Sequence, residues 1–232
     1  MTIHFLAYSS ELDTVKKAGA AVISPEHTAT PTLYRNFLKR IVDIVLILMA
    51  APIVLPLLLV CTVLVSMDGR NPFYSQMRVG RHGNPFRIWK LRTMVHNADA
   101  LLEVYLSHNP EARLEWENTQ KLKNDPRITF FGKFLRKTSI DELPQLLNVL
   151  NGTMSLVGPR PMMVCQRASY PGTKYFELRP GITGMWQVSD RNHCEFQDRA
   201  RYDDRYFETV SFGTDARILL QTVGVVLKAT GY

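Results

Sequence analysis

The chain has 232 residues, of which 46% are hydrophobic and 21% charged. This size and composition suit one ordinary domain with a tail or an anchor, and they exclude a disordered or fibrous protein. Its 28 Lys and Arg against 21 Asp and Glu give a net charge of +7, which favours acidic partners such as nucleic acid, anionic lipid or phosphorylated substrates. The three cysteines form no CxxC pair, which excludes a disulfide scaffold and a zinc ribbon and favours a reducing compartment.

The first segment, residues 1–33, is mixed in composition and weakly periodic. No charged stretch precedes a clean apolar run there, so we expect no secretory signal. We interpret this segment as an N-terminal tail and assign it no chemistry.

An uncharged apolar run of 24 residues, Ile44–Met67, comes next. As a straight helix at ~1.5 Å per residue, it would reach about 36 Å, enough to cross the hydrocarbon core of a bilayer. A buried helix this long and this apolar is uncommon in a soluble protein. The run therefore predicts contact with a membrane.

Two features of the segment 34–67 argue against a simple crossing. Pro52 and Pro56 lie inside the run, where each removes a backbone donor and predicts a bend. Both flanks are also basic, with Lys39 and Arg40 before the run and several arginines after it, and basic flanks prefer the cytoplasmic side. We therefore predict a re-entrant helix–break–helix, the alternative being a transmembrane helix with a tolerated kink.

The remaining segment, 68–232, has the pattern of one folded domain without internal repeats. Alternating apolar residues and turn signals predict two strands, and helical periodicity predicts several helices. The expected strands are Asn71–Tyr74 and Phe86–Lys90 around the turn Gly80–Gly83, and the expected helices are Ala98–Tyr105 with a continuation past Pro110 toward Gln120, Leu143–Leu150, Cys194–Phe207 and Ala216–Lys228.

An isolated pair of carboxylates is the strongest candidate for chemistry. Asp141 and Glu142 are the only acidic residues between Pro126 and Phe176, a window that holds seven basic residues. This arrangement suits phosphoryl transfer, because the cations can neutralise a diphosphate while one carboxylate attacks phosphorus. The other carboxylate can hold Mg²⁺, which prefers oxygen ligands.

Helix capping is the alternative for this pair. Ser139 and Glu142 match the S-x-x-E capping box, but a helix capped by Ser139 would place Pro144 beyond its first turn. A helix that starts at Asp141 tolerates the proline. In either case the carboxylates lie at a helix N-terminus, whose dipole favours the ionised form and is expected to keep Asp141 a carboxylate at neutral pH.

Two loops carry further cations. The Gly-Pro-Arg-Pro sequence that ends at Pro161 can hold Arg160 rigidly for bidentate contact with a phosphate, although it can also be a plain turn. The loop from Arg179 to Trp186 can approach a nucleotide or serve only as a connection. The sequence contains no Walker A motif and no His/Cys cluster for zinc or haem.

The chain resembles the bacterial sugar transferase family, the small monotopic phosphoglycosyl transferases that start exopolysaccharide and glycan assembly. The resemblance covers about residues 37–232 and depends on several motifs that occur in one order. The matching stretches are Lys39–Asp43, Gln76–Phe86, Lys90–Met94, Leu135–Leu150 with its Asp-Glu pair, Met154–Pro161 with Gly-Pro-Arg-Pro, and Arg179–Val188.

This resemblance implies an α+β fold: a helix-rich single catalytic domain with a small β element, a proline-broken re-entrant membrane helix and interfacial amphipathic helices. It also implies transfer of a hexose-1-phosphate from a UDP-hexose to undecaprenyl phosphate, with release of UMP. Asp141 would be the nucleophile that forms a phosphosugar intermediate, Glu142 would ligate Mg²⁺, and Arg160 would bind phosphate.

We accordingly expect the domain 68–232 to lie on the cytoplasmic face of the bacterial inner membrane, against its lipid. The residues expected at the membrane are Lys39, Arg40, Pro52 and Pro56. Those expected to bind substrate phosphates are Lys90, Arg92, Arg136, Gly158, Pro159, Arg160 and Arg179.

A membrane-tethered basic module that docks anionic lipid or a partner enzyme is the rival from another class, but it leaves the carboxylate pair without a task. A nucleic-acid binder has no support beyond the basic charge, so we expect no nucleic acid as partner. The choice between glucose and galactose, the oligomeric state and the roles of residues 1–33 and 95–120 remain open.

Overall fold

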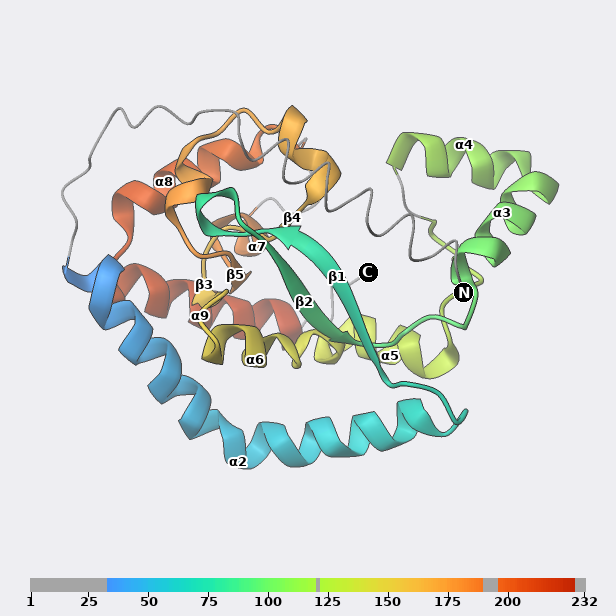
Figure 1. The fold of residues 1–232 in the computed structure, drawn as a ribbon, viewed down its shortest axis with the longest axis horizontal. Coiled ribbons are helices and arrows are strands. Elements are labelled where there is room, and N and C mark those ends of the chain that lie inside the picture. The colour runs from blue at the N-terminus through green and yellow to red at the C-terminus, as the bar shows by residue number, and fades with distance from the viewer. Residues whose placement is uncertain (1–32, 120–121, 190–195, 228–232) are drawn as a thin grey trace.

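The structure is a computed structural model of the chain, and it describes residues 33–119, 122–189 and 196–227. The expected tail therefore lies outside the described residues except for Leu33, as does Lys228 at the end of the last expected helix. Within the described ranges the chain is helix-rich, with two small sheets (Figure 1), as the sequence predicted.

The elements follow one another along the chain as helices (α), strands (β) and short 3₁₀ or π-helical turns (η). They are η1 Tyr34–Leu38, α2 Lys39–Ser66, β1 Phe73–Val79, η2 Arg81–Gly83, β2 Pro85–Leu91, α3 Ala98–His108, α4 Pro110–Thr119, α5 Phe130–Thr138, η3 Ile140–Glu142, α6 Gln145–Leu150, β3 Ser155–Val157, β4 Met162–Met163, η4 Val164–Ser169, η5 Lys174–Glu177, β5 Gly181–Thr183, α7 Met185–Val188, α8 Arg199–Thr209 and α9 Phe212–Leu227.

Helix α2 contains the apolar run and has both Pro52 and Pro56 in its interior. Figure 1 shows the helix changing direction near its middle, where these prolines lie. With η1 it forms the one helix, among the described residues, that is long and apolar enough to cross a membrane. Only 11% of its most apolar window is buried, whereas the core helix of a soluble protein would be mostly buried. The exposure of this helix supports association with a membrane.

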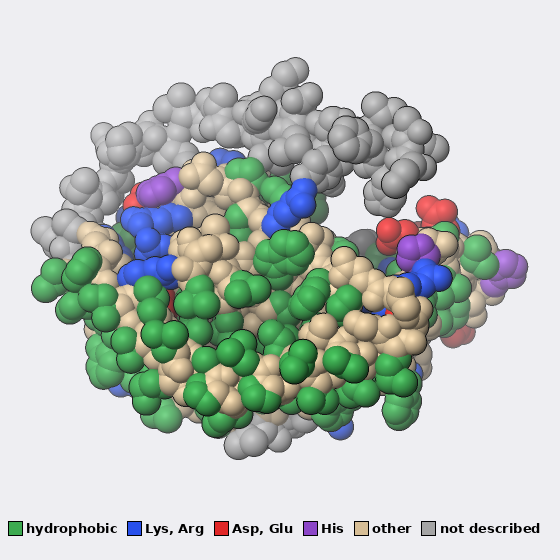
Figure 2. Space-filling view, turned by 60° about the horizontal axis from the view of Figure 1, so that its bottom comes forward, with side chains coloured by type: hydrophobic (Ala, Val, Ile, Leu, Met, Phe, Trp, Pro, Cys, Tyr) green, Lys and Arg blue, Asp and Glu red, His purple; other side chains and the backbone are tan. Residues whose placement is uncertain are grey.

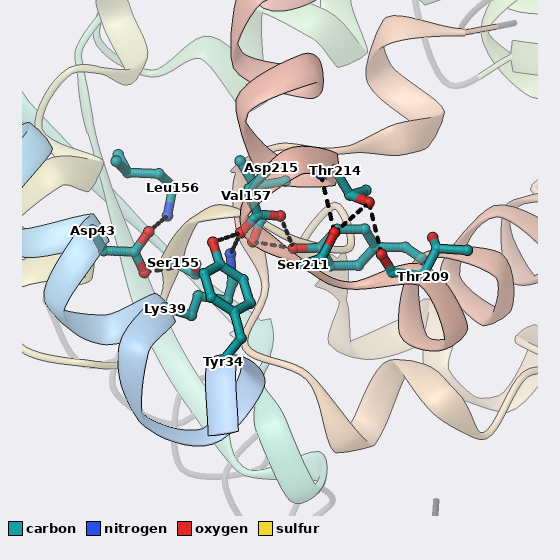
Figure 3. A network of polar contacts seen from close by, with 11 residues as sticks. Tyr34, Lys39, Asp43, Ser155, Leu156, Val157, Thr209, Ser211, Thr214 and Asp215 are labelled. Carbon is teal, nitrogen blue, oxygen red and sulfur yellow. Dashed lines mark hydrogen bonds and ion pairs between the residues drawn. The ribbon is translucent and has the colours of Figure 1, made fainter. Parts of the chain in front are cut away.

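A buried polar network holds the N-terminal end of α2 against the first turn of α9 (Figure 3). Lys39 Nζ lies 2.6 Å from Asp215 Oδ2 in α9, and the Tyr34 hydroxyl donates to the same oxygen at 2.8 Å. The Tyr206 hydroxyl donates to the other oxygen at 2.6 Å. Lys39, expected on the membrane flank, is therefore paired inside the fold.

The next turn of α2 is tied to strand β3 and to the end of α6. Asp43 accepts hydrogen bonds from the Ser155 hydroxyl at 2.7 Å and from the Leu156 N–H at 3.2 Å. Arg40 donates to the Leu150 carbonyl at 2.7 Å, at the end of α6, where a cation satisfies a free carbonyl and the helix dipole.

The C-terminal end of α2 is anchored to the same domain. Cys61 and Val65 pack in one apolar cluster with Leu91 at the end of β2. Arg92 donates to both carboxylate oxygens of Asp68 at 2.7 Å each and to the Val65 carbonyl at 2.9 Å. Both ends of the apolar helix thus contact the same folded domain, and the bend lies between these two contacts.

The larger sheet has the order β2-β1-β4 and is antiparallel throughout. Strands β1 and β2 pair over their full length, from Phe73 opposite Leu91 to Val79 opposite Pro85. The connection turns at Gly83, whose φ of +76° is strained for any residue with a Cβ. The predicted turn with a strand on each side is confirmed, but β1 runs to Val79, whereas the first strand was predicted over Asn71–Tyr74.

The smaller sheet pairs β3 and β5 in parallel, with Ser155 opposite Gly181 and Val157 opposite Thr183. Just beyond β3, Gly158 lies so close to the neighbouring chain that a Cβ there would be 2.3 Å from the Arg179 carbonyl oxygen. This close backbone contact fixes the start of the Gly-Pro-Arg-Pro turn.

Hydrophobic side chains cover the side of the molecule on which α2 lies. Figure 2 turns this side to the front, and hydrophobic residues predominate across it. They come from α5, α6 and α9 as well as α2. Exposed examples outside α2 are Phe130, Phe134, Leu147, Leu150, Leu220 and Val223. A soluble monomer rarely exposes so broad an apolar surface.

Helices α3 and α4 pack on each other and project from the rest (Figure 1). The Arg127 guanidinium lies 5.0 Å from the Trp116 ring, which joins α4 to the segment before α5. The predicted helix with an interruption near Pro110 is confirmed, and its role stays open.

Helix α9 begins at Phe212, four residues before the predicted start at Ala216. The Ser211 hydroxyl accepts a hydrogen bond from the Thr214 N–H at 3.2 Å, so Ser211 caps the first turn. The prediction missed this start because it followed the apolar periodicity, which begins only after the polar first turn.

Two glycine substitutions test the role of the close contact at the smaller sheet. In Gly158→Ala the new Cβ meets backbone atoms, so we expect a loss of about 1–3 kcal/mol in the free energy of unfolding. The matched control is Gly224→Ala in α9, where nothing lies within 4 Å, and it should gain up to about 1 kcal/mol. Thermal unfolding of the purified proteins in detergent compares them, and equal midpoints would contradict this account.

Candidate active site

The carboxylate pair lies in a tight turn between α5 and α6. Ser139 ends α5 in the left-handed conformation, with φ 58°, and Ile140–Glu142 then form a single 3₁₀ turn. Ser139 makes no capping hydrogen bond, so the capping box allowed by the sequence does not form. Pro144 stands immediately before α6, where its missing N–H costs nothing. The acidic pair thus lies in this 3₁₀ turn, before α6 begins at Gln145.

Asn148 fixes this turn against the larger sheet. Its side-chain Oδ1 accepts the Trp89 N–H at 3.1 Å, and its Nδ2 donates to the Arg87 carbonyl at 2.7 Å. Strand β2 lacks a neighbouring strand on that edge among the described residues, and the amide of Asn148 takes the place of one. Because Asn148 is only 2% exposed, the contact is inside the fold and sets α6 firmly beside β2.

The contact between α6 and β2 brings Lys90 to the carboxylates. Lys90 Nζ lies 2.6 Å from Glu142 Oε1 and 3.8 Å from Asp141 Oδ2. The sequence placed Lys90 and the acidic pair some fifty residues apart, and the structure joins them in one cluster.

Asp141 is buried, with 7% of its surface exposed. Burial raises the pKa of its carboxyl, and the neighbouring charge of Lys90 and, more weakly, that of Arg136 oppose this rise, while Glu142 adds to it. The expectation that the helix dipole would favour the ionised form is therefore wrong in direction, because desolvation outweighs it.

A cationic cavity of about 310 Å³ lies beside the pair. Its lining includes Lys90 and Glu142 together with three arginines, Arg78, Arg160 and Arg199. Burial lowers the pKa of Arg78 and of Arg199, and the charge of Arg160 lowers both further. Guanidinium groups nevertheless stay protonated. The cavity therefore has a surplus of positive charge and is suited to bind an anion.

Arg160 is held in the cavity by its backbone and by aromatic contacts. The close approach of Gly158 to the neighbouring strand fixes the chain just before it. Arg199 donates to the Arg160 carbonyl at 2.9 Å. The guanidinium carbons of Arg160 and Arg199 lie 6.0 and 4.8 Å from the centre of the Trp186 ring. Stacking on an aromatic ring positions a guanidinium group without an ion pair to a carboxylate. The charge of the guanidinium can then bind a ligand.

A buried carboxyl lies behind Arg199. Burial raises the pKa of Asp203 to about 7, although the hydrogen bond from Tyr170 and the charge of Arg199 both lower it. The Tyr170 hydroxyl donates to Asp203 at 2.5 Å. This pair packs behind the cavity and does not line it.

The structure brings together some of the predicted phosphate ligands and separates others. Lys90 and Arg160 line the cationic cavity, and Arg136 acts on Asp141 by its charge while donating to the Thr93 hydroxyl at 2.8 Å. Gly158 and Pro159 supply backbone to the turn. Two cations lie elsewhere: Arg92 binds Asp68 at the end of α2, and Arg179 donates to the Gly152 carbonyl at 3.1 Å.

Several cavity residues were not predicted as ligands. Arg78 counted as part of the basic flank after the apolar run and of the matching stretch Gln76–Phe86, and Arg199 lay inside a predicted helix without a signal of its own. Gln145 and Gln166 also line the cavity. Trp186 was noted as a possible nucleotide contact, and it does line the cavity. The pairing of β1 with β2 brings Arg78 there, which no local pattern reveals.

The site fits Mg²⁺ only in part. Among the described residues no group of three or more His, Cys, Asp or Glu side chains gathers to hold a metal ion. Asp141 and Glu142 offer adjacent carboxylate oxygens, and Glu142 lines the cavity. Mg²⁺ in nucleotide enzymes is commonly held by one or two carboxylates and the substrate phosphates. The donor set therefore fits a metal that arrives with a diphosphate.

Comparison with known proteins agrees with this site. Residues 34–229 match the bacterial sugar transferase family. The chain is 48% identical over 198 residues to a UDP-galactose-lipid carrier transferase of Erwinia amylovora, covering 84% of this chain and 42% of that protein. It is 46% identical to an undecaprenyl-phosphate galactose phosphotransferase of Salmonella typhimurium, covering 84% of this chain and 42% of the relative.

A third relative is comparable in length. The exopolysaccharide production protein ExoY of Rhizobium meliloti is 38% identical over 219 residues, covering 93% of this chain and 97% of that protein. The chain thus spans about two-fifths of the first two relatives and nearly all of the third. The family match over most of the chain, together with a 38% identical relative covered over nearly its whole length, shows that the chain belongs to the bacterial sugar transferase family.

Proposed function

We propose that this chain transfers a hexose-1-phosphate from a UDP-hexose, galactose or glucose, to undecaprenyl phosphate and releases UMP. This would be the first membrane step of exopolysaccharide or glycan biosynthesis. The main supporting observation is that Glu142 lines a cavity with three arginines, while Asp141 is buried next to it and Lys90 lies within 3.8 Å of both carboxylates. The names of the relatives, a UDP-galactose-lipid carrier transferase and an undecaprenyl-phosphate galactose phosphotransferase, point the same way.

In the proposed first step the UDP-hexose binds with its diphosphate among the arginines of the cationic cavity. An oxygen of Asp141 attacks the phosphorus bonded to the sugar, forming a bond between the carboxylate and phosphorus. The bond from that phosphorus to the UMP oxygen breaks, and its electron pair leaves with UMP. Arg78, Arg160 and Arg199 stabilise the negative charge on the diphosphate and on the departing nucleotide.

In the second step the phosphate of the lipid carrier attacks the same phosphorus. A new diphosphate bond forms, the bond to Asp141 breaks, and the carboxylate is regenerated. One diphosphate is opened and one is made, so the overall reaction runs near equilibrium. Before the first attack Lys90 must release Asp141, and an arriving phosphate can compete for the charge of Lys90 because Lys90 also lines the cavity.

Mg²⁺ bound with the diphosphate would be held by Glu142 and would neutralise phosphate charge. Lys90 holds the same carboxylate at 2.6 Å when no substrate is bound. The charge of Lys90 compensates the charge of the buried acidic pair, which limits the free-energy cost of burying it.

We also propose that α2 enters the bilayer from the cytoplasmic face and returns to it, with Pro52 and Pro56 at the turn. Support comes from the bend and from the anchoring of both ends on one domain, at Asp215 and at Arg92. The exposed apolar side chains of α5, α6 and α9 would then rest in the lipid interface. The domain 68–232 would lie on the cytoplasmic side.

Asp141→Asn tests the nucleophile. We expect it to abolish UMP release and the labelling of the protein by UDP-hexose that carries a radioactive sugar, because the amide cannot attack phosphorus. Glu142→Gln is the comparison, and it should retain some turnover while requiring more Mg²⁺ for half-maximal rate. Substantial turnover by Asp141→Asn at normal expression would remove Asp141 from this role. Wild-type protein with no transfer activity would favour a non-catalytic membrane module.

The acidic limb of the pH–rate profile tests how burial and Lys90 shift the pKa of the Asp141 carboxyl. Because burial raises the pKa of this carboxyl, activity should fall at a higher pH than for an ordinary aspartate as the solution is acidified. In Lys90→Gln the opposing charge is lost, so the limb should move to still higher pH. In Arg92→Gln, which changes a cation anchored at Asp68, the limb should not move. Equal limbs in all three proteins would contradict the assignment.

Cysteine labelling tests the hairpin. Asn36→Cys and Pro72→Cys, made singly in a variant without native cysteines, flank the two ends of α2. With a membrane-impermeant reagent, both should react from the cytoplasmic side of inverted vesicles and neither from the outside of intact cells. Reaction of the two sites from opposite faces would mean that α2 crosses the bilayer.

A further inference from the structure

A second cavity, of about 290 Å³, adjoins the cationic one. The two share Glu142, Arg160 and Ile182 in their linings. This cavity is formed where α6, β5, α7 and α9 meet, and it also reaches α2. We call it the apolar groove. Its hydrophobic lining residues include Leu57, Ile140, Leu143, Leu146, Val188 and Val225.

The lining of the groove combines apolar and charged side chains. Lys137 and Arg160 supply cations to the same lining as Glu142, whereas α9 contributes mainly valines. Among the lining hydroxyls, those of Thr183 and Thr222 bond to each other at 2.7 Å, and that of Thr138 donates to the Phe134 carbonyl at 2.8 Å, so these three already have partners within the protein. The lining thus suits a molecule with an anionic head and an apolar tail.

The groove also reaches the apolar helix. Leu57, which lines it, directly follows Pro56 near the middle of α2, where Figure 1 shows the bend. Most of α2 is exposed and hydrophobic. The groove therefore joins Arg160 to the apolar helix that the proposed function places in the lipid.

We propose that the apolar groove binds the first isoprene units of the carrier lipid, with its phosphate directed toward Arg160 and Lys137. This proposal rests on the proposed function and names the acceptor subsite within it. A UDP-hexose has no apolar part for these walls, and the cationic cavity already suits its diphosphate. The nucleotide-sugar and the lipid would thus approach Glu142 and Arg160 from two adjoining cavities, which matches two successive attacks at one phosphorus.

Val225→Trp tests the groove by filling it. The matched control is Val223→Trp, two residues earlier on α9, where the side chain is exposed and is not part of the groove lining. Steady-state kinetics with undecaprenyl phosphate in detergent should show the KM for this acceptor rising roughly tenfold in Val225→Trp, equal to about 1.4 kcal/mol. The KM for UDP-hexose and the UMP released without acceptor should match wild type. Val223→Trp should leave all three values unchanged.

An unchanged acceptor KM in Val225→Trp would overturn the proposal, as would an equal rise in the KM for UDP-hexose. Failure of the proposed function would be distinct, because wild type itself would then release no UMP. A second measurement needs no variant: wild-type protein is irradiated with a prenyl phosphate that carries a diazirine on its first isoprene unit. Labelled peptides from α6 or α9 would support the groove, and labelling confined to α2 or to α3 and α4 would overturn it.

Discussion

The structure depends on the buried ion pair between Lys39 and Asp215, which joins the start of the apolar helix to the last helix of the domain. Two tyrosine hydroxyls complete the hydrogen bonds of the carboxylate, so the pair is compensated inside the fold. Removing one partner of such a pair leaves a buried charge and is strongly destabilising. Because Arg92 holds the other end of the helix, the domain cannot rotate freely relative to it. The position of the site relative to α2 is thereby fixed.

The fixed geometry brings two chemically different cavities to one point. Arginines dominate the first and aliphatic side chains the second, and Glu142 and Arg160 belong to both. The proposed reaction between a nucleotide-sugar and a lipid phosphate would need two such cavities to meet at shared residues. Helix α6 packs beside the hairpin that carries Lys90, and it lines the second cavity together with α9.

Asp141 illustrates how tertiary context reverses a local rule. At a helix start its carboxyl should have a low pKa, yet burial raises the pKa, and Lys90 moderates the rise. A desolvated carboxylate becomes more reactive than a solvated carboxylate when its compensating cation moves to another anion. The packing around Asn148 and the adjoining strand offsets the free-energy cost of burying the Asp141 carboxyl.

The sequence alone determined the family, the helix-rich fold with a β hairpin, the apolar helix with its prolines and the acidic pair, because motif order, periodicity and composition are local properties. Only the tertiary structure decided which cations serve that pair. Lys90 and Arg160 reach the cavity, Arg78 and Arg199 join them unpredicted, and Arg92 and Arg179 are used as anchors. All six are equally basic in the sequence. Their tasks differ because strand pairing and helix packing, which join residues far apart in the chain, decide whether each guanidinium or ammonium meets a carboxylate, a carbonyl or an open cavity.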